Sequence, residues 1–206
     1  MQHFTPHPYQ QAAIDAIIDK PSVGLWMEMG LGKTVVTLTA IDTLIYDAAE
    51  IRRVLVVAPK KVAEATWQDE VQKWDHLQHL RISTVLGTEA QRIAALNTPA
   101  DVYIINRENC YWLVGYYGRH WPFDMVVLDE ASSFKNHAAQ RFKALKAVRP
   151  KIAKVVELTG TPAPNNLLDL WAQIYLLDQG ERLGKYVTHY RQAYFWPTEY
   201  SWEAKD

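Results

Sequence analysis

The stretch Met27-Glu28-Met29-Gly30-Leu31-Gly32-Lys33-Thr34 follows an apolar run and opens a segment of helical periodicity. This strand-to-helix setting is the one that a phosphate-binding loop requires. Gly30 and Gly32 let the backbone turn so that successive N–H groups face an anion, and the new helix adds its partial positive charge. We therefore expect Lys33 to bridge the terminal phosphates of a nucleotide and the Thr34 hydroxyl to ligate Mg²⁺.

A second chemical signal is a pair of adjacent carboxylates, Asp129-Glu130, at the end of the apolar run 125–128. Parallel α/β sheets bind their ligands at the carboxyl ends of the strands. We expect Asp129 to hold Mg²⁺ directly or through water, and Glu130 to orient and deprotonate an attacking water. The loop and the acidic pair together predict a site that hydrolyses a nucleotide.

The rest of the chain alternates short apolar runs with segments of helical periodicity. The apolar runs lie at 23–29, 54–58, 82–86, 102–105, 125–128 and 154–158, and the clearest helical periods at 34–49, 62–74, 140–148 and 167–177. Buried strands that alternate with helices are typical of a parallel sheet covered on both faces. We predict a doubly wound α/β fold over residues 1–178, and a polar, aromatic C-terminal extension without strands over residues 179–206.

The composition is that of a folded globular protein, with 49% apolar and 22% charged residues in a chain of 206. The single cysteine, Cys110, excludes an internal disulfide and fits a reducing compartment. No signal peptide and no apolar run long enough to cross a bilayer is visible, so we expect a soluble intracellular protein. The net charge of −1 does not indicate nucleic-acid binding, but residues 135–154 carry seven basic side chains and no acidic one.

A third segment follows the last apolar run and is the most specific one in the chain. It reads Leu158-Thr159-Gly160-Thr161-Pro162-Ala163-Pro164-Asn165-Asn166-Leu167. This run closely resembles motif III of the superfamily 2 helicase-like translocases, in particular the Swi/Snf-type DNA-dependent ATPases. Residues 28–34 resemble motif I of the same family, which lacks the early Gly of the general phosphate loop and so accounts for Met27 at that position.

Three weaker similarities agree with this family. His7-Pro8-Tyr9-Gln10 resembles its adenine-recognising Q motif, and residues 57–61 resemble motif Ia. The tryptophans that follow motif Ia, Trp67 and Trp74, are interpreted as packing residues without a chemical role. Residues 129–132 are similar to motif II, although Ser stands at position 132 where the commonest family form has His. The motifs together extend from residue 7 to residue 178, which is nearly the whole chain.

The resemblance implies a RecA-like lobe, a P-loop NTPase that binds ATP and Mg²⁺ and moves on duplex DNA once a second RecA-like lobe closes over it. The residues implied at the nucleotide are His7 and Gln10 at adenine, Met29, Gly30, Leu31, Gly32, Lys33 and Thr34 at the phosphates, Thr34 and Asp129 at Mg²⁺, and Lys33, Asp129 and Glu130 in catalysis. The residues implied in nucleic-acid contact or coupling are Lys60, Lys61, Thr159, Thr161 and Asn165, with the segment 135–154 as an accessory DNA surface.

Each of the outlying residues also has a purely structural interpretation. Gln10 can cap the first helix, Thr159 and Thr161 can bond backbone groups of their own loop, and Lys60 and Lys61 can be solvated side chains at a helix start. Two other functions stay open: the motor lobe of an RNA helicase or of a restriction system, and a non-catalytic adaptor gated by nucleotide. The Asn165-Asn166-Leu167 continuation argues against the first alternative, and the intact pair Asp129-Glu130 argues against the second.

The family's second lobe and its arginine finger are expected to be missing from this chain, because no strand–helix alternation follows residue 178. We therefore expect the chain alone to bind MgATP weakly and to turn it over little or not at all. The expected location is cytoplasmic or nucleoid-associated for a bacterial or viral protein, and nuclear for a eukaryotic one.

Overall fold

The computed structural model describes residues 1–162, 167–198 and 201–205. Six parallel strands form one sheet in the order β1-β6-β5-β2-β4-β3. Their bounds are β1 (Ser22–Trp26), β2 (Val54–Ala58), β3 (Ile82–Val85), β4 (Val102–Asn106), β5 (Met125–Asp129) and β6 (Lys154–Thr159). Every residue of β2, β4 and β6 is buried, as strands covered on both faces require, whereas the edge strand β3 alternates in burial. The predicted parallel sheet is confirmed.

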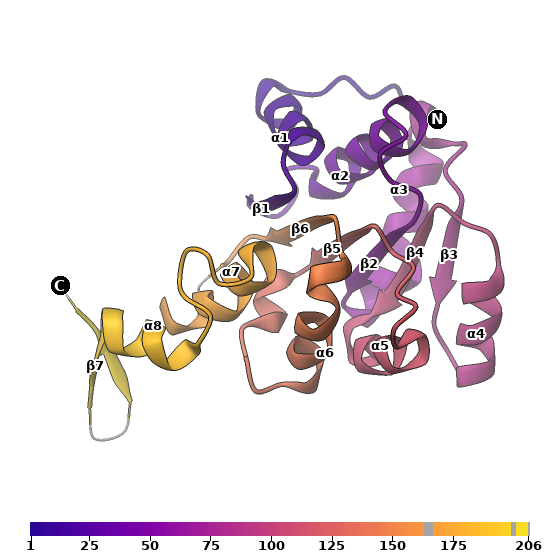
Figure 1. Cartoon of the computed structure of the whole chain (residues 1–206). Coiled ribbons are helices and arrows are strands. Elements are labelled where there is room, and N and C mark those ends of the chain that lie inside the picture. Colours follow the sequence, from indigo (N-terminus) through magenta and orange to yellow (C-terminus); the bar gives the residue numbers. More distant parts are fainter. Residues whose placement is uncertain (163–166, 199–200, 206) are drawn as a thin grey trace.

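Helices cover both faces of the sheet, which gives three layers (Figure 1). One face carries α1 (Pro8–Asp19), α2 (Lys33–Asp42) and α3 (Trp67–Lys73), and the other carries α4 (Glu89–Asn97), α5 (Cys110–Tyr117), α6 (Gln140–Val148) and α7 (Leu170–Asp178). Each face has its own hydrophobic core, with Ile17, Leu38 and Trp67 buried on the first and Leu113, Phe142 and Trp171 on the second. None of the helices in the described residues is both long and apolar enough to span a bilayer.

Two of the predicted helices are interrupted by π-helical turns. The helix expected over 34–49 is α2 followed by a π-helical turn at Thr43–Asp47, and the one expected over 62–74 begins with such a turn at Val62–Thr66 before α3. Turns of this kind are often found at functional sites. The second of them contributes Thr66 to the pocket described below.

The C-terminal extension contains strands, so the prediction that it has none is wrong. It consists of α8 (Val187–Tyr194) and a short antiparallel pair, β7 (Phe195–Pro197) and β8 (Trp202–Ala204). Each strand has only three residues, which is too short to give a recognisable alternation. The pair is fixed instead by its aromatic residues, since Phe195 is buried against Tyr190.

The strand order places three chain segments at one edge of the sheet. β6 lies between β1 and β5, with Trp26 opposite Thr159 and Leu158 opposite Asp129. Because the strands are parallel, their carboxyl ends meet at this edge. The phosphate loop after β1, the segment after β6 and the acidic pair at the end of β5 are therefore neighbours.

Candidate nucleotide site

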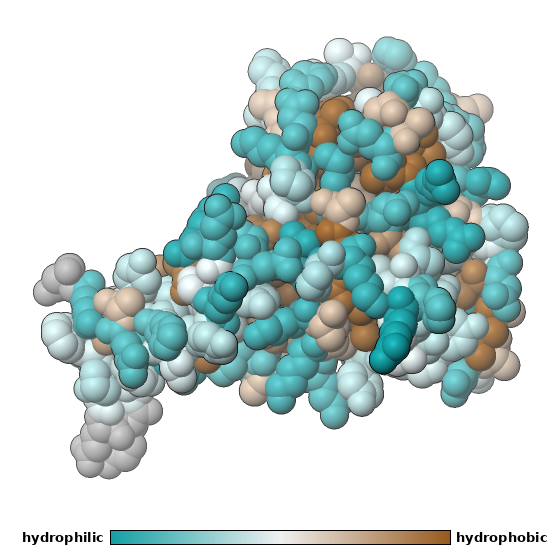
Figure 2. Space-filling view, viewed as in Figure 1, coloured by the Kyte–Doolittle hydropathy of each residue, from teal (hydrophilic) through white to brown (hydrophobic). Residues whose placement is uncertain are grey.

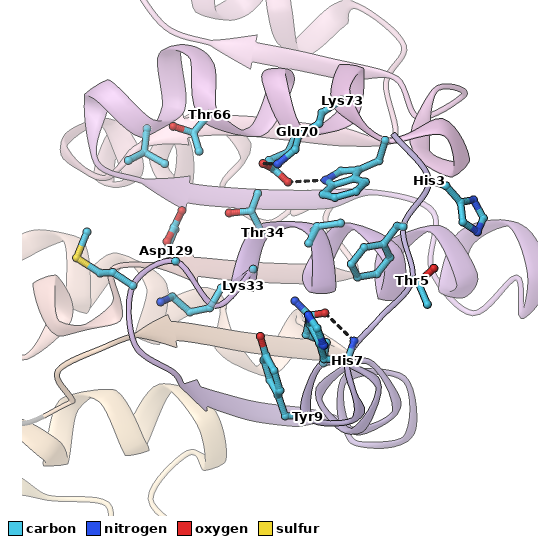
Figure 3. A pocket seen from close by; sticks show the side chains of 18 of the residues that line it. His3, Thr5, His7, Tyr9, Lys33, Thr34, Thr66, Glu70, Lys73 and Asp129 are labelled. Carbon is cyan, nitrogen blue, oxygen red and sulfur yellow. Dashed lines mark hydrogen bonds and ion pairs between the residues drawn. The ribbon is translucent and has the colours of Figure 1, made fainter. Parts of the chain in front are cut away.

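A hollow of about 680 Å³ opens at this edge of the sheet (Figure 3). Its wall is formed by four parts of the chain: the N-terminal segment, the phosphate loop with the start of α2, the residues before and along α3, and the acidic pair. The predicted nucleotide-binding residues that line it are His7, Gln10, Met29, Gly30, Gly32, Lys33, Thr34, Asp129 and Glu130. Leu31 lies in the loop but not in the lining, and it contributes its backbone carbonyl to a contact with Gln10.

The phosphate loop depends on two glycines in the left-handed backbone region. Gly30 has φ +82° and Gly32 has φ +80°, a conformation that other residues rarely adopt. Gly32 is the residue that precedes α2, and a Cβ there would lie 2.6 Å from Nε2 of Gln10. Position 32 thus needs Gly for its backbone angle, and a Cβ there would also displace the end of the Gln10 side chain. The first N–H groups of α2, which have no acceptor within the helix, face the pocket as an anion site requires.

The Lys33 ammonium lies inside the loop. Its Nζ donates to the carbonyl oxygens of Met27, at 2.8 Å, and Glu28, at 2.9 Å. Both acceptors are neutral, so the positive charge is held in place without being neutralised. The N–H of Met27 in turn donates to the carbonyl of Thr159 at 3.1 Å, which ties the loop to the end of β6.

Gln10 joins the first helix to the phosphate loop. Its side-chain oxygen accepts a hydrogen bond from the His7 N–H at 2.9 Å, and its Nε2 donates to the Leu31 carbonyl at 3.2 Å. The first bond is the helix-capping role anticipated from the sequence. The His7 ring stacks on that of Tyr9, with centroids 5.7 Å apart, at the exposed rim of the pocket. The proposed adenine contacts thus lie directly beside the loop that would hold the phosphates.

Asp129 lies beside Lys33 in the pocket (Figure 3), and Glu130 also lines it. Burial raises the pKa of Asp129, and a hydrogen bond from the indole of Trp67 opposes this effect. The Trp67 Nε1 donates to Oδ2 of Asp129 at 3.0 Å. Glu130 has φ +58°, a left-handed conformation that costs a non-glycine residue about 1 kcal/mol and is concentrated at functional sites.

Trp67 is the functional residue that the sequence did not reveal. It is fully buried, so its interpretation as a packing residue was correct but incomplete. A buried indole N–H requires an acceptor, and this requirement was the only available signal. The sequence cannot show that the acceptor is Asp129, because the two residues are joined only by the fold.

Trp67→Phe is expected to lower the affinity for Mg²⁺ in the presence of ATP about 10-fold, because it removes a partner that orients the carboxylate predicted to hold Mg²⁺. Phenylalanine keeps an aromatic ring in the core but is smaller than tryptophan, so thermal unfolding must show that the variant is folded. The comparison is between nucleotide titrations with and without Mg²⁺. Trp74→Phe is the control, since the Trp74 indole bonds Glu70 at the other end of the pocket. An equal dependence on Mg²⁺ in the two variants would contradict this role of Trp67.

The predicted coupling residues are only partly brought together. Thr159 is buried, and its Oγ1 accepts a hydrogen bond from the Thr161 N–H at 3.1 Å, so it does bond a backbone group of its own loop. Lys60 and Lys61 are exposed beyond β2, outside the pocket lining, and Nζ of Lys60 lies 3.8 Å from Glu64. Asn165 lies outside the described residues.

The segment 135–154, which the resemblance implies as an accessory DNA surface, does not expose all of its basic side chains. Arg149 is buried and donates to the carbonyls of Leu176 and Leu177, and Lys154 is buried and donates to the carbonyl of Ile18. These two cations support the packing of helices against the sheet. An accessory surface is therefore restricted to the remaining basic residues of the segment.

The parallel sheet, the glycine-dependent loop and the acidic pair at the strand ends define a RecA-like P-loop NTPase fold. Within this class the chain belongs to the SNF2-related domain family, which it matches over residues 19–198. The resemblance to the Swi/Snf-type helicase-like ATPases is confirmed at the level of the family.

Relatives of the chain include both phage and eukaryotic proteins. It is 41% identical to putative protein p41 of Acyrthosiphon pisum secondary endosymbiont phage 1, over 95% of this chain and 44% of that protein. It is 29% identical to Helicase SWR1 of Cryptococcus neoformans (85% and 14% covered) and 30% identical to the mouse DNA excision repair protein ERCC-6-like (78% and 13% covered). The chain thus spans less than half the length of each of these relatives.

A solved structure shows the same fold. The SWI2/SNF2 ATPase core of Sulfolobus solfataricus, determined in complex with dsDNA, superposes with a TM-score of 0.73 at 24% identity. The match covers 94% of this chain and 41% of that one. It confirms the RecA-like arrangement of the lobe.

Proposed function

We propose that this chain is the ATP-binding lobe of a Swi/Snf-type motor that couples ATP hydrolysis to movement on duplex DNA. The observation that carries the proposal is the convergence of Lys33, Thr34, Asp129 and Glu130 on one pocket beside a loop of left-handed glycines. A phosphate-binding loop and two carboxylates at neighbouring strand ends are what hydrolysis of a phosphoanhydride requires.

The geometry assigns a task to each of these groups. The first N–H groups of α2 and the Lys33 ammonium bind the phosphates, since Lys33 is held by neutral carbonyls that a phosphate can replace. Thr34 and Asp129 would hold Mg²⁺, which neutralises charge on the phosphate oxygens when it is bound. Glu130 would orient a water and accept its proton. The left-handed backbone of Glu130 turns the chain directly after Asp129.

The activity of the complete motor also depends on a second RecA-like lobe. That lobe would supply an arginine to the transferring phosphoryl group, an effect of roughly 10³ to 10⁵ in rate. We therefore expect this chain alone to bind MgATP, to hydrolyse it little or not at all, and not to translocate.

Duplex DNA is the proposed partner. The Sulfolobus ATPase core with the same fold was solved in complex with dsDNA. In this chain Lys60 and Lys61 are exposed beyond the carboxyl end of β2, on the same edge as the nucleotide pocket. Lysines so placed can contact backbone phosphates, and such contacts confer affinity without reading base sequence.

Equilibrium titration with a fluorescent ATP analogue tests the proposal. We expect saturable binding that depends on Mg²⁺ and that unlabelled ATP displaces, with no burst of hydrolysis when duplex DNA is added. Absence of saturable binding by the folded chain would contradict the nucleotide site. Strong DNA-stimulated turnover by the monomeric chain would contradict the requirement for a second lobe.

A further inference from the structure

A second hollow, of about 260 Å³, lies between α6, α7 and the start of α8, away from the nucleotide pocket. The surface over these helices is mostly hydrophilic (Figure 2). The residues that line the hollow include His137, Lys143, Lys146, Trp171, Lys185 and Tyr186. No carboxylate lines it among the residues that the structure describes. We call this hollow the basic pocket.

The lysines of the basic pocket are free to bind an anion. Lys143 and Lys146 lie three residues apart on α6 and so project from the same side of the helix. Nζ of Lys146 is held over aromatic rings, 4.4 Å from the centroid of Tyr175 and 5.7 Å from that of Trp171. Within the described ranges, no ion pair joins Lys143, Lys146 or Lys185 to a carboxylate.

The C-terminal extension builds the other wall of the basic pocket. Trp171 is buried, and its Nε1 donates to the carbonyl of Gly184 at 3.0 Å, which fixes the turn before α8. This turn brings Lys185 and Tyr186 opposite α6, and the first residues of α8 complete the lining. Among the first N–H groups of α8, that of His189 donates to the Tyr186 carbonyl at 3.1 Å. The N–H groups of Val187 and Thr188, two residues that line the hollow, are left as donors beside the lysines.

The lowered pKa of His137 reflects the excess of positive charge around the basic pocket. Its ring lies 6.0 Å from that of Trp171. Burial lowers the pKa of His137, and the nearby cations Arg191, Lys143 and Lys146 lower it further. The Nε of Arg191 is itself buried without a hydrogen-bond partner in the described part of the chain. An anion in the basic pocket would offset part of this positive charge.

We propose that the basic pocket binds a backbone phosphate of duplex DNA, as a contact separate from the lysines after β2. Tyr186, which is 62% exposed, offers a ring on which the attached sugar can pack. Three lysines and free helix N–H groups are the donors that proteins use for backbone phosphates. The inference rests on the proposed function, because it takes its ligand from the DNA on which the motor acts.

The basic pocket lies beside two segments that reach the nucleotide pocket: the one after the acidic pair and the one after β6. His137 follows closely on the acidic-pair segment, where Lys135 pairs with Asp169 at 3.3 Å. Trp171 follows the segment after β6, and Gln173 beside it donates to the carbonyl of Pro162 at 2.6 Å. DNA bound in the basic pocket would therefore contact helices that hold both segments in place.

The test compares two double variants in binding a short labelled DNA duplex by fluorescence anisotropy at several salt concentrations. Lys143→Gln with Lys185→Gln removes two pocket charges, and we expect about 10-fold weaker binding and a salt dependence that is shallower by about two phosphate contacts. Lys20→Gln with Arg52→Gln removes two exposed charges that precede β1 and β2, at the opposite edge of the sheet. This control is expected to change the affinity less than twofold.

A second readout is the NMR titration of His137 in the wild-type chain. Duplex DNA is expected to raise the pKa of His137, and inorganic phosphate at the same concentration is not. If the two double variants bind DNA equally well, the basic pocket is not a DNA contact, and the proposed function is unaffected. A response to inorganic phosphate without one to DNA overturns DNA as its ligand. A wild-type chain that binds MgATP but no duplex contradicts the DNA part of the proposed function together with this inference.

Discussion

Lys33→Ala is expected to lower the affinity of the chain for MgATP at least about 100-fold. The variant removes a positive charge that is held by the Met27 and Glu28 carbonyls inside the loop. Hydrogen bonds to charged groups contribute about 1.5 to 3 kcal/mol each, and every 1.4 kcal/mol is a factor of about ten in affinity. Two phosphate contacts of this kind account for the expected loss. The measurement is a titration with the fluorescent ATP analogue.

The control for this variant is Lys60→Ala, which removes an exposed lysine outside the pocket lining. It should bind MgATP as the wild-type chain does. Lys33 is only half-buried and bonds two carbonyls near solvent, so Lys33→Ala should cost no more than about 1 kcal/mol of folding free energy. Thermal unfolding checks this point. A folded Lys33→Ala variant with wild-type affinity would mean that the phosphates do not bind at this loop.

The sequence predicts the sheet well because burial on both faces leaves a local signature. The continuous apolar run of β2 gave its bounds, and the phosphate loop followed because a glycine-dependent turn between a strand and a helix has few other uses. The pairing of the loop with Asp129 could be inferred from the rule that ligands lie at the carboxyl ends of parallel strands.

The contacts around these motifs could not be predicted, since they join residues that are distant in the sequence. The bond from Trp67 to Asp129 and the bond from Gln10 to Leu31 exist only once the sheet has formed. The charge count of segment 135–154 likewise could not separate the buried Arg149 from the exposed Lys143, because both are basic residues on a helical stretch. Burial is decided by packing, which a charge run does not encode.

Glu157 on β6 is the feature most at odds with its surroundings. It is fully buried, between Gly24 of β1 and Leu128 of β5, and neither of its carboxyl oxygens has a hydrogen-bond partner in the described residues. Burial raises its pKa well above the ordinary value, although the charge of Arg149 opposes this. Arg149 itself donates to the carbonyls of neighbouring backbone and does not bond the carboxylate.

Glu157→Leu is therefore expected to raise the free energy of unfolding by about 1 to 4 kcal/mol at neutral pH, since an unpaired buried polar group is replaced by an apolar one. The folded chain holds the Glu157 proton more tightly than the unfolded chain does. Its contribution to stability is thus fully present below the ordinary pKa of about 4.5 and is lost as the pH rises through the raised pKa. The advantage of the variant should grow with pH, which urea unfolding at several pH values will measure.

Asp101 provides the matched control, because it is also buried but is fully hydrogen-bonded. It accepts bonds from Arg81 and Tyr46, and these hold its pKa below the ordinary value although burial alone would raise it. Asp101→Leu should therefore destabilise the chain, and most strongly above the ordinary pKa of the carboxyl group, where the wild-type chain keeps the full benefit of the lowered pKa. If Glu157→Leu raises the free energy of unfolding and Asp101→Leu lowers it, hydrogen bonding decides whether a buried carboxyl group stabilises this fold. Loss of stability in Glu157→Leu would instead mean that Glu157 has a partner such as a buried water, and that its carboxyl group supports the fold.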